Sequence, residues 1–186
     1  LEFEFTEAQK VRVEEFQGNE FVGIPILPTL YKCGYDEEVL WLVGRFIADG
    51  HLRDNELIIS VGENKLYQFN KVSIPHRVHK NSDSCYRVVF SRKTPIYSAV
   101  KELTNCGKAI NKMFNTKCLF FDNECVKTIL DGYMSGDGCY VEKTNCHQAT
   151  TTSKDLANQL VLMVQKVFGV GAKIYETKRP KKYIIQ

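Results

Sequence analysis

One segment of this chain occurs twice with the same internal spacing, and it limits the possible folds more than any other feature. Leu42 to Gly50 has the sequence LVGRFIADG, and Leu130 to Gly138 has the sequence LDGYMSGDG; both fit the pattern L-x-G-x-x-x-x-D-G. Corresponding residues are 88 positions apart in the 186-residue chain. The repeat predicts two halves of similar plan.

Each copy has the features of a helix that ends at an Asp-Gly pair. Residues 36–38 and 122–124 bring acidic or amide side chains to the first turns, where the helix dipole favours negative charge. Gly50 and Gly138 follow the last helical residues and can adopt the left-handed conformation that often ends a helix. We therefore expect two matching helices with left-handed glycine ends.

Similar patterns follow both copies. In the first half, residues 57–61 are a β-branched run and residues 64–72 have a helical pattern. An alternating run follows at residues 85–90, and a closing helix is predicted at residues 94–104. In the second half, residues 139–142 and 149–152 are strand-like, and an amphipathic helix follows Ser153 at residues 155–168. A third strand-like segment is at residues 172–175. These patterns predict an α+β fold made of a tandem αββαββα repeat, with the second closing helix absent from the sequence.

Small residues recur on one face of each predicted helix. Gly44 and Ala48 are four residues apart in the first, and Gly132 and Gly136 are four apart in the second. Small side chains allow two helix backbones to approach closely, so we expect the two helices to pack against each other.

Asp49 and Asp137 lie at the ends of these helices, where the helix dipole disfavours a carboxylate. If the helices pack, the two carboxylates converge, and like charges about 5 Å apart repel by roughly 3 kcal/mol at an effective dielectric near 20. A bound cation would reverse both effects, and Mg²⁺ prefers one or two carboxylates together with phosphate oxygens. A single Asp-Gly pair is more often a simple turn, but two copies in the same pattern favour a metal site.

The two motifs and the elements around them resemble the monomeric, two-motif LAGLIDADG homing endonucleases, over residues 35–186. The resemblance implies two saddle-shaped antiparallel sheets that grip double-stranded DNA, and hydrolysis of both strands. It implies that Asp49 and Asp137 bind Mg²⁺ or Mn²⁺, helped by the carbonyl groups of Ala48 and Gly136. Lys117 best matches a catalytic lysine found before the second motif in that family, although a surface lysine without a role is an equal alternative.

The resemblance also predicts the domain organisation. Residues 10–25 and 151–157 are similar to segments of intein endonucleases, although the sequence has no splicing residues at its ends. We expect an intein-like leader in residues 1–30, a first half in residues 31–116 and a second half in residues 117–186.

Basic residues provide candidate DNA contacts. The net charge is only +3, but positive residues cluster in two regions. Alternate residues of a strand share one face, so each cluster could follow a DNA groove. The predicted DNA-binding residues are Arg77, Lys80, Arg87, Lys173, Lys178, Arg179, Lys181 and Lys182.

Other features restrict the class of protein. The sequence has no stretch of roughly 20 apolar residues and no basic, then apolar, leader, so we expect neither a membrane span nor a secretory signal. Seven cysteines without a C-x-x-C pair favour reduced thiols. We predict a monomer in the cytoplasm or nucleus, wherever the host DNA lies. Two alternatives remain: a LAGLIDADG-like module that binds DNA or RNA without cutting it, and an unrelated α+β enzyme.

Overall fold

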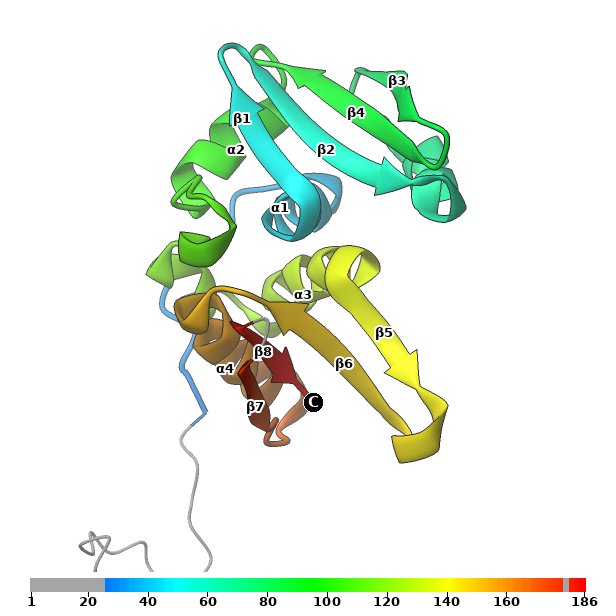
Figure 1. Cartoon of the computed structure of the whole chain (residues 1–186). Helices are drawn as coiled ribbons and strands as arrows, with labels where there is room; N and C mark the ends of the chain where they lie inside the picture. Colours follow the sequence, from blue (N-terminus) through cyan, green and yellow to red (C-terminus); the bar gives the residue numbers. More distant parts are fainter. Residues whose placement is uncertain (1–25, 179–180) are drawn as a thin grey trace, which may run out of the picture.

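The protein consists of two similar halves, each built on a four-stranded antiparallel sheet (Figure 1). The computed structural model describes residues 26–178 and 181–186. The elements of the first half are α1 (Glu37–Asp49), β1 (Gly50–Arg53), β2 (Glu56–Gly62), the 3₁₀ helix η2 (Glu63–Lys71), β3 (His76–Ser82), β4 (Cys85–Ser91) and α2 (Pro95–Leu103). The connection contains η3 (Ala109–Asn111) and η4 (Thr116–Phe120). The elements of the second half are α3 (Asn123–Asp137), β5 (Gly138–Val141), η5 (Glu142–Thr144), β6 (Cys146–Thr151), α4 (Lys154–Phe168), β7 (Ile174–Lys178) and β8 (Lys181–Ile185).

The two sheets have the same topology. Their strand orders are β1-β2-β4-β3 and β5-β6-β8-β7, and every paired neighbour is antiparallel. The predicted α+β fold with two antiparallel sheets is therefore confirmed.

The middle helix differs between the halves. In the second half it is the α-helix α4, which buries Leu156, Ala157, Leu160 and Met163, and the side chain of Ser153 accepts a hydrogen bond from Leu156 N at 3.2 Å. The corresponding segment of the first half is the 3₁₀ helix η2, in which only Phe69 is buried. An apolar face normally holds an amphipathic helix to its core, so η2 has little that would stabilise a longer α-helix.

The helices α1 and α3 lie side by side at the centre of the molecule, between the two sheets (Figure 1). Their contact is a main-chain contact at two glycines. A Cβ at Gly44 would overlap the carbonyl oxygen of Ile129 and lie 2.7 Å from the backbone nitrogen of Tyr133, and a Cβ at Gly132 would overlap the carbonyl oxygen of Trp41. Both halves therefore share one continuous apolar core across this contact.

The ends of α1 and α3 differ from the expectation. Gly50 has φ −94° and ψ 161°, and Gly138 has φ −87° and ψ 152°, so both are extended and the left-handed prediction is wrong. Each glycine starts a strand directly, because β1 and β5 begin there. Glycine is required for space: a Cβ would lie 2.8 Å from the Cα of Phe46 at the first position and 2.8 Å from the Cα of Met134 at the second.

Residues 27–31 pack against the second half. The backbone nitrogens of Leu30 and Tyr31 donate to the carbonyl of Phe120, and Lys166 Nζ donates to the carbonyls of Leu27 and Pro28 at 3.1 and 2.9 Å. Most of the predicted leader, residues 1–25, lies outside the described residues. In the described part of the chain, no helix is both long and apolar enough to span a membrane.

Candidate catalytic site

The two aspartates predicted to bind metal are the last residues of α1 and α3. The ends of these helices meet across the axis that relates the two halves. A Cβ at Gly136 would lie 2.5 Å from the Cβ of Ala48 and 3.0 Å from Oδ2 of Asp49. The fold thus brings the Asp49 carboxylate next to the residue that precedes Asp137.

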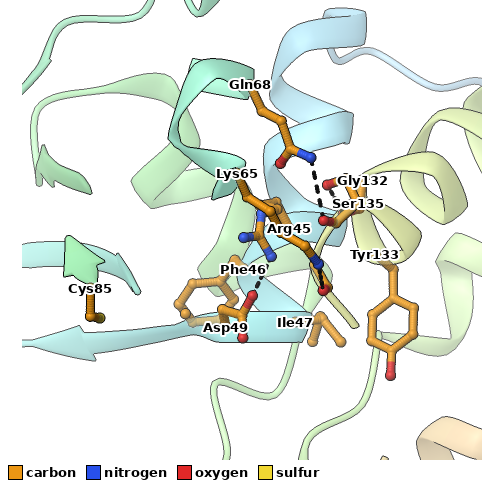
Figure 2. Close-up of polar contacts among 12 residues, drawn as sticks. Arg45, Phe46, Ile47, Asp49, Lys65, Gln68, Cys85, Gly132, Tyr133 and Ser135 are labelled. Atoms are coloured by element: carbon orange, nitrogen blue, oxygen red, sulfur yellow. Dashed lines mark hydrogen bonds and ion pairs between the residues drawn. The ribbon is translucent and has the colours of Figure 1, made fainter. Parts of the chain in front are cut away.

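Asp49 is paired with an arginine from its own helix. Arg45 Nη1 donates to Asp49 Oδ2 one turn later (Figure 2). The Arg45 side chain is fully buried, its Nε has no hydrogen-bond partner, and its Nη1 lies directly over Gly136. Gly136 is therefore needed to make room for a guanidinium group as well as for the opposite helix.

Asp137 has a different environment. It forms no ion pair within the described residues. Burial, and after it the charge of Asp49, raise the pKa of its carboxyl to about 6, against the opposing effects of Lys112, Arg45 and Lys65. The two carboxylates are thus close enough for their charges to repel.

Lys112 is the lysine that the fold brings to this pair. Its buried Nζ donates to the carbonyls of Phe46 and Ile47 at 3.0 Å each, and to the carbonyl of Gly50 at 2.6 Å. Burial lowers the pKa of Lys112 to about 8, although the carboxylates of Asp137 and Asp49 act in the opposite direction. The ammonium group satisfies three carbonyl acceptors at the end of α1, where a positive charge is favourable.

Lys117, which the sequence singled out as catalytic, lies in another environment. It belongs to η4, and its Nζ donates to the carboxylate of Glu102 at the end of α2. Glu102 also accepts a hydrogen bond from the hydroxyl of Tyr35. The structure does not bring Lys117 to the aspartate pair.

The 3₁₀ helix η2 also reaches the site from the first half. Lys65 Nζ donates to the carbonyl of Gly136, and Gln68 Nε2 donates to the carbonyl of Ser135 at 3.5 Å (Figure 2). These carbonyls belong to the last turn of α3, which has no basic residue of its own. η2 therefore supplies, from the other half, the donors that this helix end lacks.

A pocket of about 250 Å³ opens beside Asp137. Ala48 and Lys112 line one part of it, and residues 150–152 and Lys182 line another. Asp49 does not line this pocket, so the surroundings of the two aspartates are unequal.

Each sheet has one face turned to the core and one turned away from it. In the first sheet, Leu57, Ile59, Val88 and Phe90 belong to the core, so their neighbours along the strands face outward. The pairs Arg77↔Val89 and His79↔Arg87 place Arg77 and Arg87 on the outward face. The pair Lys80↔Tyr86 has the opposite parity, so Lys80 lies on the other face of the sheet from the two arginines.

The second sheet has two of the predicted basic residues on its outward face, Lys173 and Lys182. Tyr183 and Ile185 belong to the core, which turns Lys182 outward, and Lys173 has the same parity on the paired strand because it bonds to Gln186. Arg179 and the side chains of Lys178 and Lys181 lie outside the described residues.

Comparison with known proteins places this geometry in a recognised fold. Residues 124–185, from α3 to β8, match the sequence profile of the LAGLIDADG-like domain family. The structure of I-DmoI in complex with DNA and Ca has 16% identity and a TM-score of 0.58, with 80% of this chain and 81% of that chain covered. The fold is that of the LAGLIDADG homing endonucleases.

Other solved structures share this fold. Full-length DUF199/WhiA from Thermatoga maritima has 15% identity and a TM-score of 0.55, with 82% of this chain covered. This chain spans only 52% of that protein. The homing endonuclease I-WcaI bound to its DNA recognition sequence has 13% identity and a TM-score of 0.51, with 80% of this chain and 75% of that chain covered. No curated protein matches the chain.

Several residues of the site were missed in the sequence. Arg45 was detectable, because a charge inside the apolar run of α1 needs a buried partner and Asp49 follows four residues later. Lys65, Gln68 and Lys112 had no local signal, since each acts on a carbonyl group more than 60 positions away.

Proposed function

We propose that this protein is a site-specific DNA endonuclease that hydrolyses phosphodiester bonds with a divalent metal ion, Mg²⁺ or Mn²⁺. The observation that carries the proposal is the convergence of Asp49 and Asp137 at the ends of two helices packed backbone to backbone. The Asp137 carboxylate costs free energy at this place without a cation, because burial and the charge of Asp49 disfavour its ionised form.

The donor set suits a metal that shares its shell with a substrate. Within the described residues, no group of three or more His, Cys, Asp or Glu side chains gathers around one point. Two carboxylates with the carbonyls of Ala48 and Gly136 leave room for phosphate oxygens and water, which is the arrangement that Mg²⁺ prefers. When bound, the ion would polarise the phosphate and activate the attacking water.

The protein's own residues would orient and stabilise this reaction. Asp137 borders the pocket in which a phosphate and a water molecule would lie, and Lys112 places a positive charge at its edge. We assign to Lys112 the supporting role that the sequence suggested for Lys117, because Lys112 lies at the pocket and Lys117 is paired with Glu102.

DNA would bind along the outward faces of the two sheets. Arg77, Arg87, Lys173 and Lys182 are the described basic residues on these faces that the sequence predicted. Arg77 is already paired with Glu56, so it would contribute less net charge to a phosphate contact than Arg87.

Further details of the proposal rest on the sequence. We propose a monomer, because both motifs are in one chain, and a location in the cytoplasm or nucleus with the DNA that is cut. Descent from an intein is supported by the segments at residues 10–25, which lie outside the described residues, and at residues 151–157.

A module that binds nucleic acid without cutting it is the second candidate. The ion pair between Arg45 and Asp49 favours it, because a guanidinium group already neutralises one of the two carboxylates.

Cleavage of a randomised duplex library decides between the two candidates. The reaction contains Mg²⁺, with Ca²⁺ and the Asp49→Asn/Asp137→Asn double variant as controls. The endonuclease predicts Mg²⁺-dependent cutting at one long site that the double variant loses. Specific binding without cutting in Mg²⁺ would reject the endonuclease and support the binding module.

A further inference from the structure

Two metal positions follow from the pseudo-twofold arrangement of the site, and they differ in this protein. One consists of Asp49 and Gly136, which belong to different halves but lie next to each other, since a Cβ at Gly136 would lie 3.0 Å from Asp49 Oδ2. The other consists of the Asp137 carboxylate and Ala48, which line the same pocket. The symmetry of the backbone therefore offers two equivalent positions.

Cationic side chains already bind both groups of the first position. Arg45 Nη1 donates to Asp49 Oδ2, and Lys65 Nζ donates to the Gly136 carbonyl (Figure 2). Arg45 is fully buried, and Asp49 holds it by an ion pair within one helix. A divalent ion at this position would have to displace two positive groups or remain beside them, and both alternatives weaken its binding.

No cationic side chain forms an ion pair with Asp137 in the described part of the chain. The residue that corresponds to Arg45 by the repeat is Tyr133, whose hydroxyl donates to the carbonyl of Thr150 at 3.3 Å. Lys112, the cation whose charge lowers the pKa of Asp137 most, uses its three donors on the end of α1. The second position thus keeps an open pocket and a carboxylate that has the Tyr133 hydroxyl beside it but no ion-pair partner among the described residues.

We propose that the Asp137–Ala48 position alone takes a divalent metal ion readily, and that Arg45 and Lys65 act as built-in cations at the Asp49–Gly136 position. This inference rests on the proposed function and deepens it. The scissile phosphate next to Asp137 would receive the metal, and the phosphate next to Asp49 would meet fixed positive charges instead. The protein would then cut one DNA strand much faster than the other.

The orphan Nε of Arg45 supports this assignment. A buried guanidinium with an unused donor is costly when its role is only packing. The cost is explained if the Arg45 guanidinium is retained because its positive charge acts at the Asp49–Gly136 position.

Mn²⁺ binding to the full chain without DNA tests the inference. Electron paramagnetic resonance measures the concentration of free ion as Mn²⁺ is added to the protein, to three variants and to one control variant. The first two are Asp137→Asn and Asp49→Asn. The third is the Arg45→Met/Lys65→Met double variant, with Arg45→Met/Lys71→Met as its matched control, since Lys71 is also on η2 but binds neither group.

The expected result is one readily filled site in the native protein. Asp137→Asn weakens this site by more than about 100-fold, the upper end of what loss of a supporting partner costs, whereas Asp49→Asn changes it less than about tenfold. The Arg45→Met/Lys65→Met variant, which lacks both cationic side chains, binds a second Mn²⁺ ion. Its matched control binds a second ion less tightly. Two sites of similar affinity in the native protein, no binding, or equal losses in the two aspartate variants would overturn the inference.

The experiment distinguishes loss of folding from loss of metal binding, and failure of this inference from failure of the proposed function. Thermal melting shows which variants are folded, and if the double variants unfold, the two aspartate variants still decide the question. One Mn²⁺ bound through Asp137 in a protein that cuts no DNA would reject the proposed function alone. Two equal sites in a protein that cuts both strands at equal rates would reject this inference alone.

Discussion

Replacing Asp137 by asparagine should stabilise the metal-free protein. The pKa of Asp137 is raised from its ordinary value of 3.8 to about 6, so the folded protein disfavours the ionised form. At about 1.36 kcal/mol per pKa unit this rise corresponds to about 3 kcal/mol. Asp137 is only half-buried, so solvent screens part of the cost, and we expect a gain of about 1–2 kcal/mol.

The pH dependence has a definite sign. A carboxyl group with a raised folded-state pKa gives its full stabilisation below its ordinary pKa and loses it as the pH rises through about 6. The advantage of Asp137→Asn is therefore largest above pH 7 and shrinks towards zero near pH 4.

The equivalent change on the other helix should have the opposite effect. Asp49→Asn removes the partner of the buried Arg45 guanidinium, which destabilises the protein. Leaving a buried charge without its partner costs about 3–5 kcal/mol, and less here because Asp49 is partly exposed.

Thermal melting at pH 7.5 with a metal chelator measures both variants. For a protein of this size, 1 kcal/mol corresponds to about 2–4 °C, so Asp137→Asn should raise the melting temperature by about 2–8 °C. Mg²⁺ should then stabilise the native protein and leave the variant unchanged. A lower melting temperature for Asp137→Asn at pH 7.5 would show that Asp137 contributes to stability and would refute the account of an uncompensated carboxylate.

Three further results are expected. Gly44→Ala should lower the free energy of unfolding by about 1–3 kcal/mol in urea titrations, because its Cβ overlaps the opposite helix backbone, whereas Gly34→Ala, which has open space, should change it little. The native protein should gain up to about 3 kcal/mol of stability between pH 8 and 10.5, because the unfolded chain binds the proton of Lys112 more tightly, and Lys112→Met should lack this rise. Replacing Lys173 or Lys182 by glutamine should reduce the slope of log Kd against log salt by about 1 each if both contact phosphates, and an unchanged slope would remove that residue from the interface.

The fold could be predicted in large part because its pattern is local. Apolar periodicity and the repeated motif predict the central helices and most strands. The capping residues Asp122 and Ser153 directly precede the helices α3 and α4, so they too can be recognised locally. The prediction of left-handed glycines was wrong because a strand begins directly at each glycine, without a turn. An Asp-Gly pair in the sequence does not reveal the backbone angles of its glycine.

The polar shell of the site was less predictable. Asp49 and Asp137 stand out because a repeated acid at a helix end is unfavourable. Lys112 and Lys117 are five residues apart in the same connection, and only the path of that connection decides which of them reaches the site. Lys80 illustrates the same limit, since a shift of one residue in register turns a side chain to the other face.

The contact between α1 and α3 has a consequence for how such a protein can change over generations. Its closest approach is made by main-chain atoms at Gly44 and Gly132, so it does not depend on the side chains of either sheet. Substitutions on the outward faces of the sheets leave the contact between α1 and α3 intact. The two halves can therefore diverge one at a time, and each can acquire new surface chemistry while the pair stays assembled.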